Sequence, residues 1–479
     1  MLDEAVERVL NVVFAGEEQH RPEVISDKET DHKKAADIET ECAVLLENNG
    51  ILPLNTDRKV AYIGEFAEKP RYQGGGSSHI NPFRVVSALD AAREKGRSVT
   101  YAKGFSNEND SMTEQELEKA LRTAAEADVA VIFAGLPEIF ESEGYDRTSM
   151  KLPKCQDRLI EEVLKVQPNV VVVLHNGSPV ELPWADRVSA ILEMYLGGQG
   201  VGEACDRLLF GEANPSGRLS ETFPYRLEDN PSFLHFPGNG KRVLYGEDIF
   251  VGYRYYDTKK VPVRYAFGHG LSYTEFTYGD LTLSSAQMTD EDILTVSLKV
   301  KNSGKTEGKE VVQLYVADLC GISERPVKEL KGFAKVHLLP GEEKTVSMEI
   351  SARNLSYYEE RLGDWYAPSG TYRILIGHAS DDIRLHADIV FKTKKKLPLR
   401  VDFTTTFGEL LDHTKTAPVI TELLAPLAAA AASAEGMSDE YKKLGEQVIR
   451  EMPLKSLLGQ MPGEQVEQLI GQLNCLLAQ

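Results

Sequence analysis

A run of apolar residues, Val129-Ala-Val-Ile-Phe-Ala134, leads into the acidic segment Glu141-Ser-Glu143-Gly-Tyr145-Asp146-Arg147. The first run is continuously apolar, as is typical of a strand that is covered on both faces of a sheet. Open α/β sheets bind their ligands outside the carboxyl ends of the strands, where the acidic segment would lie. Acidic loops are more often ordinary solvated surface, so this segment alone leaves both interpretations open.

Short apolar runs alternate with helical segments on both sides of this stretch. This order predicts a mainly parallel sheet with helices on both faces, that is, a doubly wound α/β sandwich domain over residues 31–224. The expected strands are residues 60–66, 99–102, 129–134, 170–174 and 190–195, and the expected helices are 85–95, 114–127, 156–166 and 202–210.

Two helices are expected before this sheet. Residues 2–15 repeat apolar side chains at helical spacing and belong to a helical lead-in over residues 1–30. Residues 31–47 predict a second helix, followed by Asn48-Asn49-Gly50. Glycine and asparagine readily adopt the left-handed conformation that ends helices, so we expect the helix to stop there.

Three further regions follow the α/β domain. Residues 225–280 are rich in aromatic residues and glycine, which indicates an ordered connector. Residues 281–395 alternate apolar and polar side chains between turn signals, which predicts a seven-stranded β-sandwich. Residues 396–479 predict a helical tail, with helix boundaries expected at Pro418, Pro426, Pro453 and Pro462.

The composition excludes several classes of protein. The 479 residues carry a formal net charge of −20, which disfavours nucleic acid and anionic membrane as partners. The sequence has no apolar run long enough to span a bilayer, and residues 1–14 do not form a secretory signal, so we expect a cytoplasmic protein. The five cysteines lack the spacing of a metal site, so reduced thiols and no cofactor are expected.

Several motifs coincide, in unbroken order over residues 1–395, with one family. They are Gly74-Gly-Gly76-Ser77-Ser78, Glu143-Gly-Tyr-Asp-Arg147, Asn214-Pro-Ser-Gly217, Tyr253-Arg-Tyr-Tyr-Asp257 and Phe267-Gly-His-Gly-Leu-Ser-Tyr273. Together they resemble glycoside hydrolase family 3. The predicted β-sandwich likewise resembles the fibronectin type III-like domain of that family.

The resemblance implies a retaining β-glycosidase, commonly a β-glucosidase, that acts on β-linked glucosides or related oligosaccharides. In this family an aspartate on a TIM barrel is the nucleophile, and a glutamate on the α/β domain is the acid/base. Glu143 matches the acid/base, whereas the barrel and its aspartate have no counterpart in these residues. The expected partner is therefore a TIM-barrel domain from a missing segment or another chain, which makes this chain a fragment or half of a split enzyme.

Retaining hydrolysis needs two carboxyl groups about 5 Å apart, one that attacks and one that transfers the proton. Glu143 supplies only the second function, and without the barrel we expect it to titrate as an ordinary glutamate and the chain to be inactive alone. Glu141 is the second choice for the acid/base, because it lies two residues earlier and would face the other way in an extended segment. Asp146 and Arg147 are predicted to form an ion pair that holds the loop.

The resemblance also implies substrate contacts at Arg71, Ser78, Tyr145 and Arg147. The glycines of residues 74–78 would permit a tight turn near the sugar. This loop lacks the spacing of a phosphate-binding fingerprint, which argues against a nucleotide-binding protein.

A protein of a different class fits the same sequence: a non-catalytic carbohydrate-binding or scaffolding protein that kept the fold after losing the barrel. A barrel-encoding frame directly upstream would favour the enzyme, and unrelated upstream sequence would favour the binding protein. An apolar face left by a missing barrel would also favour self-association, so a homo-oligomer is possible.

Overall fold

The computed structural model describes residues 1–21, 23–321, 324–432 and 438–478. They form two compact units, one of Met1–Ser356 with Ala367–Thr393 and the other of Tyr357–Tyr366 with Lys394–Gln479. Residue 22 of the expected lead-in, and residues 433–437 and 479 of the expected helical tail, lie outside the described residues. Within the described part of the chain, every helix is too short or too polar to cross a membrane.

A six-stranded sheet forms the centre of the α/β domain. Its strands follow the order β1-β6-β5-β4-β2-β3; β2 to β6 run parallel, and β1 pairs antiparallel with β6. The strands are β1 (Val44–Asn48), β2 (Val60–Ile63), β3 (Val99–Ala102), β4 (Val129–Gly135), β5 (Val170–His175) and β6 (Ala190–Glu193). Every residue of β4 and β5 is buried, as expected for strands covered on both faces.

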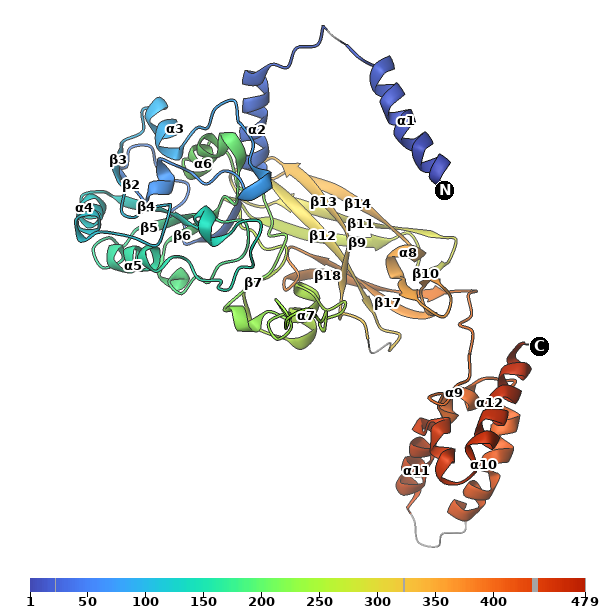
Figure 1. Ribbon diagram of the computed structural model, residues 1–479. Helices are drawn as coiled ribbons and strands as arrows, with labels where there is room; N and C mark the ends of the chain where they lie inside the picture. The colour runs from blue at the N-terminus through green and yellow to red at the C-terminus, as the bar shows by residue number, and fades with distance from the viewer. Residues whose placement is uncertain (22, 322–323, 433–437, 479) are drawn as a thin grey trace. The chain divides into compact units, whose positions relative to one another are not determined.

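Helices cover both faces of this sheet (Figure 1). One group contains α2 (Lys28–Cys42), α3 (Ala88–Glu94) and α6 (Val201–Leu209), and the other contains α4 (Glu114–Ala125) and α5 (Lys154–Val163). Helix α4 begins at a capping box in which the side chains of Thr113 and Glu116 each accept from the other residue's backbone N–H. The predicted doubly wound α/β fold is confirmed.

The helix predicted over residues 31–47 is wrong at its carboxyl end. Helix α2 stops at Cys42, and residues 44–48 form strand β1 at the edge of the sheet. Val44, Leu45 and Leu46 are fully buried. A continuous apolar run of this length fits a buried strand as well as a buried helix, so the sequence pattern does not distinguish the two. Pairing with β6 decides between the two.

The lead-in contains one long helix, and the connector contains short elements. Helix α1 (Leu2–Glu18) has no buried residue. The connector holds α7 (Tyr253–Lys259) and β8 (Val263–Tyr265), and β8 pairs with β7 (Phe223–Pro224) at the end of the α/β domain. The rings of Tyr253 and Phe267 stack with their centroids 4.6 Å apart, whereas Phe233, Phe236 and Tyr245 of the same region are exposed.

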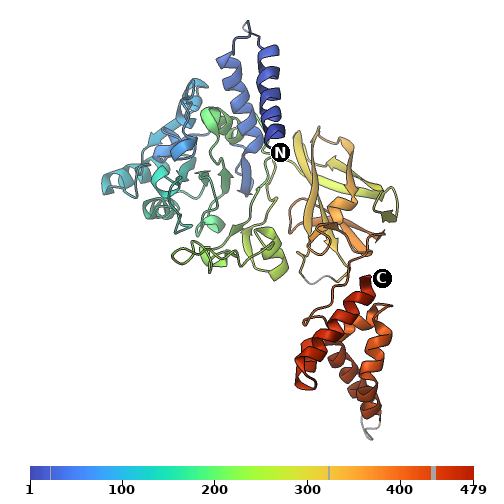
Figure 2. The ribbon, with the colours of Figure 1, turned by 45° about the vertical axis from the view of Figure 1, so that its right-hand side comes forward.

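The β-sandwich follows the connector (Figure 2). The sandwich has one sheet of order β10-β18-β17-β12-β13 and a second of order β14-β11-β9. Its described residues therefore form eight strands, whereas seven were predicted. The additional strand is β10, which has three residues and pairs with β18. The elements are β9 (Phe276–Leu283), β10 (Gln287–Thr289), β11 (Ile293–Asn302), β12 (Gly308–Asp318), β13 (Glu329–Leu338), β14 (Glu343–Ser351), α8 (Ala352–Leu355), β17 (Gly370–Gly377) and β18 (Ile383–Lys392).

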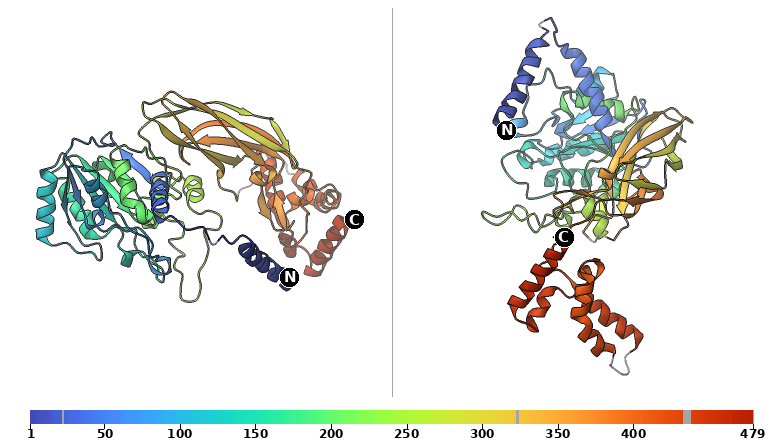
Figure 3. Two further views of the ribbon diagram at one scale, coloured as in Figure 1. Left: turned by 90° about the horizontal axis from the view of Figure 1, so that it is seen from above. Right: turned by 90° about the vertical axis from the view of Figure 1, so that its right-hand side faces the viewer.

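The second unit is a helical bundle with a small hairpin (Figure 3). It contains β15 (Tyr357–Glu359), β16 (Asp364–Tyr366), α9 (Phe407–Asp412), α10 (Ala417–Ala432), α11 (Asp439–Glu451) and α12 (Gly463–Ala478). Its own core includes Phe407, Leu410 and Leu454. The boundary expected at Pro426 is wrong, because this proline lies inside α10, whereas Pro462 directly precedes α12.

Candidate active site

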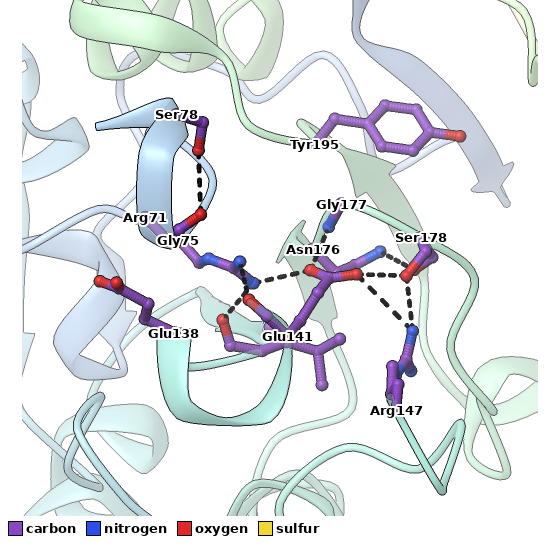
Figure 4. Close-up of polar contacts among 12 residues, drawn as sticks. Arg71, Gly75, Ser78, Glu138, Glu141, Arg147, Asn176, Gly177, Ser178 and Tyr195 are labelled. Carbon is purple, nitrogen blue, oxygen red and sulfur yellow. Dashed lines mark hydrogen bonds and ion pairs between the residues drawn. The ribbon is translucent and has the colours of Figure 1, made fainter. Parts of the chain in front are cut away.

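The candidate site lies at the carboxyl edge of the central sheet, as the sequence predicts for an open α/β sheet. The loop after β4 carries the acidic segment, and the loop after β5 contributes Asn176, Gly177 and Ser178 (Figure 4). The far end of the acidic loop is anchored because Met150 and Leu152 are buried and Met150 accepts a hydrogen bond from the backbone of Glu181.

Glu141 is fixed at the centre of this edge (Figure 4). Its Oε2 accepts from Arg71 Nη1 at 2.7 Å and from the backbone N–H of Gly177 at 2.7 Å, and its Oε1 accepts from the hydroxyl of Ser178. Its backbone carbonyl accepts from Arg71 Nη2 at 2.7 Å. These bonds hold both oxygens and the backbone of Glu141 in place, which favours a structural role for this residue over proton transfer.

Glu143 lies in a different environment, two residues further along. It is exposed, and its Oε2 accepts from the backbone N–H of Ser77 at 2.7 Å. Hydrogen bonds from the hydroxyl and the backbone N–H of Ser77 lower the pKa of Glu143. The expectation that Glu143 titrates as an ordinary glutamate is therefore wrong. The pKa of Glu143 is lower than usual, and the hydrogen bonds from Ser77 are the cause.

The predicted glycine turn lies directly against the acidic loop. Residues Gly76–Ser78 form a single 3-10 turn, and Gly76 has a φ of +78°. A Cβ at Gly76 would meet the Cβ of Glu143 at 2.7 Å, and a Cβ at Gly75 would overlap the hydroxyl of Ser142. The glycines therefore allow the two loops to touch, and this contact positions Glu143.

A cleft of about 730 Å³ is lined by Ser142 and Tyr145, the neighbours of Glu143 in the acidic loop, although not by Glu143 itself, and we call it the acid-loop cleft. Its walls include Arg71, Tyr72, Glu138, Ser142 and Tyr145. The Tyr145 side chain is 50% exposed and its hydroxyl donates to the carbonyl of Glu138 at 3.0 Å. A concave site with mixed polar and aromatic walls is suited to a small polar ligand.

The four predicted substrate contacts occupy unequal positions. Tyr145 faces the acid-loop cleft, and Ser78 is exposed and donates to the carbonyl of Gly75 at 3.1 Å. Arg71 is buried, and its Nη1 and Nη2 are engaged by Glu141 and by the carbonyl of Leu136. Substrate contact by Arg71 stays a prediction, while its role in holding the acidic loop follows from these bonds.

Arg147 donates from Nη1 to the hydroxyl of Ser178 at 2.6 Å and lies 3.7 Å from Oε1 of Glu141. The predicted ion pair with Asp146 is therefore wrong, because the guanidinium turns toward Glu141. Burial lowers the pKa of Arg147, against the opposing effect of Glu141.

Buried carboxyl groups lie behind the site. Burial raises the pKa of Glu193 to about 8 and that of Glu39 to about 8, and the charge of Glu193 adds to the second shift. Asn176 donates from its amide to Oε2 of Glu193 at 2.9 Å. Burial raises the pKa of Glu221 to about 7, and the nearby charge of Glu141 makes a smaller contribution in the same direction. These three groups hold protons at pH values where exposed carboxyl groups do not.

Sequence reasoning missed Ser77, Gly177, Ser178 and Glu193 as members of this edge. Ser77 lies inside the quoted glycine motif, and Gly177 and Ser178 follow a predicted strand. Because open α/β sheets bind ligands outside the carboxyl ends of their strands, the position of Gly177 and Ser178 directly after a strand is the signal that could have identified them. Within the described residues, no group of three or more His, Cys, Asp or Glu side chains could hold a metal ion.

Comparisons with known proteins agree with this architecture. Residues 43–273 match the glycosyl hydrolase family 3 C-terminal domain, and residues 310–380 match the fibronectin type III-like domain. The chain is 44% identical to thermostable beta-glucosidase B of Acetivibrio thermocellus over 99% of its own length and 63% of that protein. It is 38% identical to an exo-alpha-(1->6)-L-arabinopyranosidase of Bifidobacterium breve over 96% of the chain and 60% of that protein.

A solved structure shows the same fold. The GH3 beta-glucosidase of Bifidobacterium adolescentis aligns with a TM-score of 0.78 at 38% identity, over 84% of this chain and 59% of that one. An α/β domain followed by a β-sandwich is the combination that the two matching family models describe. The chain belongs to glycoside hydrolase family 3 and matches the C-terminal part of its members. It spans somewhat less than two thirds of the length of these relatives.

Proposed function

We propose that this chain is the acid/base-bearing part of a retaining β-glycosidase that acts on β-linked glucosides or related oligosaccharides. Its partner in this proposal is a TIM-barrel domain that carries the nucleophilic aspartate. The observation that carries the proposal is the contrast within one loop: Glu143 is exposed and directly follows Ser142 of the acid-loop cleft, whereas Glu141 is fixed by Arg71. Two similar proteins are named as beta-glucosidases, which supports this substrate class.

In the proposed reaction, Glu143 gives its proton to the glycosidic oxygen while the nucleophile attacks the anomeric carbon. The glutamate then takes a proton from the water that releases the sugar. A general acid needs a raised pKa, whereas Ser77 lowers the pKa of Glu143 in this chain. A docked barrel would reverse this shift, because it would desolvate Glu143 and place a negative charge near it.

A fusion protein tests the proposal. The N-terminal segment of the Acetivibrio thermocellus protein that this chain does not match is placed ahead of Met1, and nitrophenol release from an aryl β-glucoside is measured. We expect turnover by the fusion and none by the 479-residue chain. Turnover by the chain alone that disappears in Glu143→Gln would contradict the need for a barrel.

The leaving group identifies the role of Glu143. In the fusion, Glu143→Gln should slow hydrolysis of a nitrophenyl glucoside by about 100-fold or more and slow that of a dinitrophenyl glucoside much less, because the better leaving group needs no proton. Azide should restore turnover by replacing water as the nucleophile. Equal loss on both substrates, without rescue by azide, would assign the proton transfer to another group.

A further inference from the structure

A second cavity, of about 630 Å³, lies on the other side of the acidic loop. It is bounded by residues 146–150 of that loop, by the segment that precedes β7, and by the aromatic connector. We call it the connector pocket. Its residues belong to one compact unit, and none of them is assigned a role in the proposed reaction except Arg147.

The wall of this pocket holds polar groups that the protein leaves unsatisfied. Arg147 Nη2, Thr222 Oγ1 and Glu247 Oε2 are buried and have no hydrogen-bond partner among the described residues. A buried polar atom without a partner costs about 1–3 kcal/mol. These atoms have almost no accessible surface in the empty pocket, so the hydroxyl groups of a ligand recover the missing hydrogen bonds only when the side chains of the wall shift to meet them.

Apolar rings complete the wall. Phe233 and Phe236 line the pocket from the connector and are 42% and 51% exposed, and the buried Tyr256 lines it as well. Exposed aromatic rings beside a cavity are available for stacking on an apolar face of a ligand. A pyranose ring offers such a face of C–H groups together with a rim of hydroxyl groups.

The charges of the wall oppose an anionic ligand. Asp146, Glu221 and Glu247 bring three carboxyl groups to the pocket against the one guanidinium of Arg147, and the raised pKa of Glu221 leaves that carboxyl group partly neutral near pH 7. The donor on Arg147 and the acceptors on Glu247 and Thr222 suit hydroxyl groups, which both donate and accept.

We propose that the connector pocket binds a neutral pyranoside unit of a saccharide, as a second carbohydrate site beside the acid-loop cleft. The shared loop, residues 142–150, contributes to both cavities, so a saccharide in the connector pocket lies close to the proposed acid/base. Binding there requires neither hydrolysis nor the barrel, and it is measured on the 479-residue chain.

Calorimetric titration with cellobiose tests this proposal. We expect saturable binding that the double substitution Phe233→Ala/Phe236→Ala weakens by about tenfold or more. The matched control is Leu234→Ala, which changes an 85% exposed residue of the same segment that does not line the pocket and should leave the affinity unchanged. No binding of cellobiose, or equal affinity in the double variant, would overturn the proposal.

Two further measurements locate and define the ligand. Tyr72→Ala removes part of the wall of the acid-loop cleft, and loss of all cellobiose binding in that variant, with binding kept in Phe233→Ala/Phe236→Ala, would place the sugar in the other cavity and overturn the assignment. The aldonic acid of cellobiose should bind about fivefold more weakly than cellobiose, because the ionised carboxyl groups of the wall repel it. Tighter binding of the acid would make the pocket an anion site. Failure of the fusion enzyme to hydrolyse glucosides would leave these binding results unaffected.

Discussion

Glu141 and Glu143 show how strongly two residues of one loop can differ. The Glu141 side chain is 18% exposed and is paired with Arg71, which is 6% exposed, whereas Glu143 is exposed. Removing one partner of a buried pair leaves the other charge uncompensated, which costs about 3 kcal/mol or more. Glu141→Gln should therefore lower the free energy of unfolding of the larger unit by about 3 kcal/mol, measured by urea denaturation at pH 7.

Glu143→Gln is the control for that measurement, since an exposed carboxylate contributes little to folding. We expect its unfolding midpoint to stay close to that of the unchanged chain. Equal midpoints for both variants would contradict the structural role of Glu141.

Glu193 predicts a pH dependence of stability. Its pKa is raised by burial from 4.5 to about 8 in the folded chain. A group whose pKa is raised on folding contributes its full stabilisation below the unfolded pKa and loses it as the pH rises through the folded pKa. Its contribution should fall between about pH 4.5 and 8, by up to about 1.4 kcal/mol per pH unit.

The comparison with Glu193→Gln isolates this effect, because the amide mimics the neutral acid and cannot ionise. Urea unfolding at pH 5, 6, 7 and 8 should show the variant gaining stability relative to the unchanged chain as the pH rises. A constant difference across this range would show that Glu193 does not titrate there.

At the residue scale, sequence reasoning placed the site but not its internal bonds. The acidic loop was predicted at the carboxyl edge of a strand, because hydrophobic runs and the edge rule are local signals. The partner of Arg147 was not predictable, since Glu141 and Asp146 are both near in sequence and only the folded position of Ser178 turns the guanidinium toward Glu141.

At the scale of elements, the glycine turn sets the position of the acidic loop. Gly75 has a φ of −88°, which any residue tolerates, so Gly75→Ala adds only the overlap with Ser142 and with Cγ of Glu138 at 2.8 Å. Overpacking of this kind costs about 1–3 kcal/mol. We expect the fusion enzyme with Gly75→Ala to lose most of its kcat on an aryl β-glucoside, because Glu143 moves with Ser142.

Gly279→Ala is the control, since a Cβ there meets no atom within 4 Å and the residue lies in β9 of the sandwich. Its kcat should be unchanged. If Gly75→Ala and Gly279→Ala retain equal activity, the loop contact does not position the acid/base.

Strands that stand out in the sequence as separate apolar runs were predictable, and β1 was not. Strands β2 to β6 combine short apolar runs with flanking turn signals, whereas residues 44–48 continue the apolar pattern of the preceding helix without a break. The pairing of β1 with β6 joins residues about 145 positions apart, which a local pattern cannot report.

At the scale of the whole molecule, the two compact units have separate cores. The helical unit should therefore unfold in its own calorimetric transition. Phe407→Ala should lower the temperature of that transition, because truncating a buried phenylalanine costs about 3–5 kcal/mol, and should leave the transition of the larger unit in place. A single transition that shifts as a whole in this variant would show that the units unfold together.

The buried carboxylate of Glu310, on β12 of the sandwich, has a further consequence. It accepts from Arg218 Nη2 at 2.7 Å and from the hydroxyl of Tyr278 at 2.6 Å, and it pairs with His378 Nδ1 at 2.7 Å. Arg218 precedes the connector, so this one side chain ties the end of the α/β domain to the sandwich. An engineer who recombines such proteins and cuts within the connector would separate Arg218 from Glu310. A chimaera therefore needs both residues from the same parent, and the unit of exchange is the joined pair of domains.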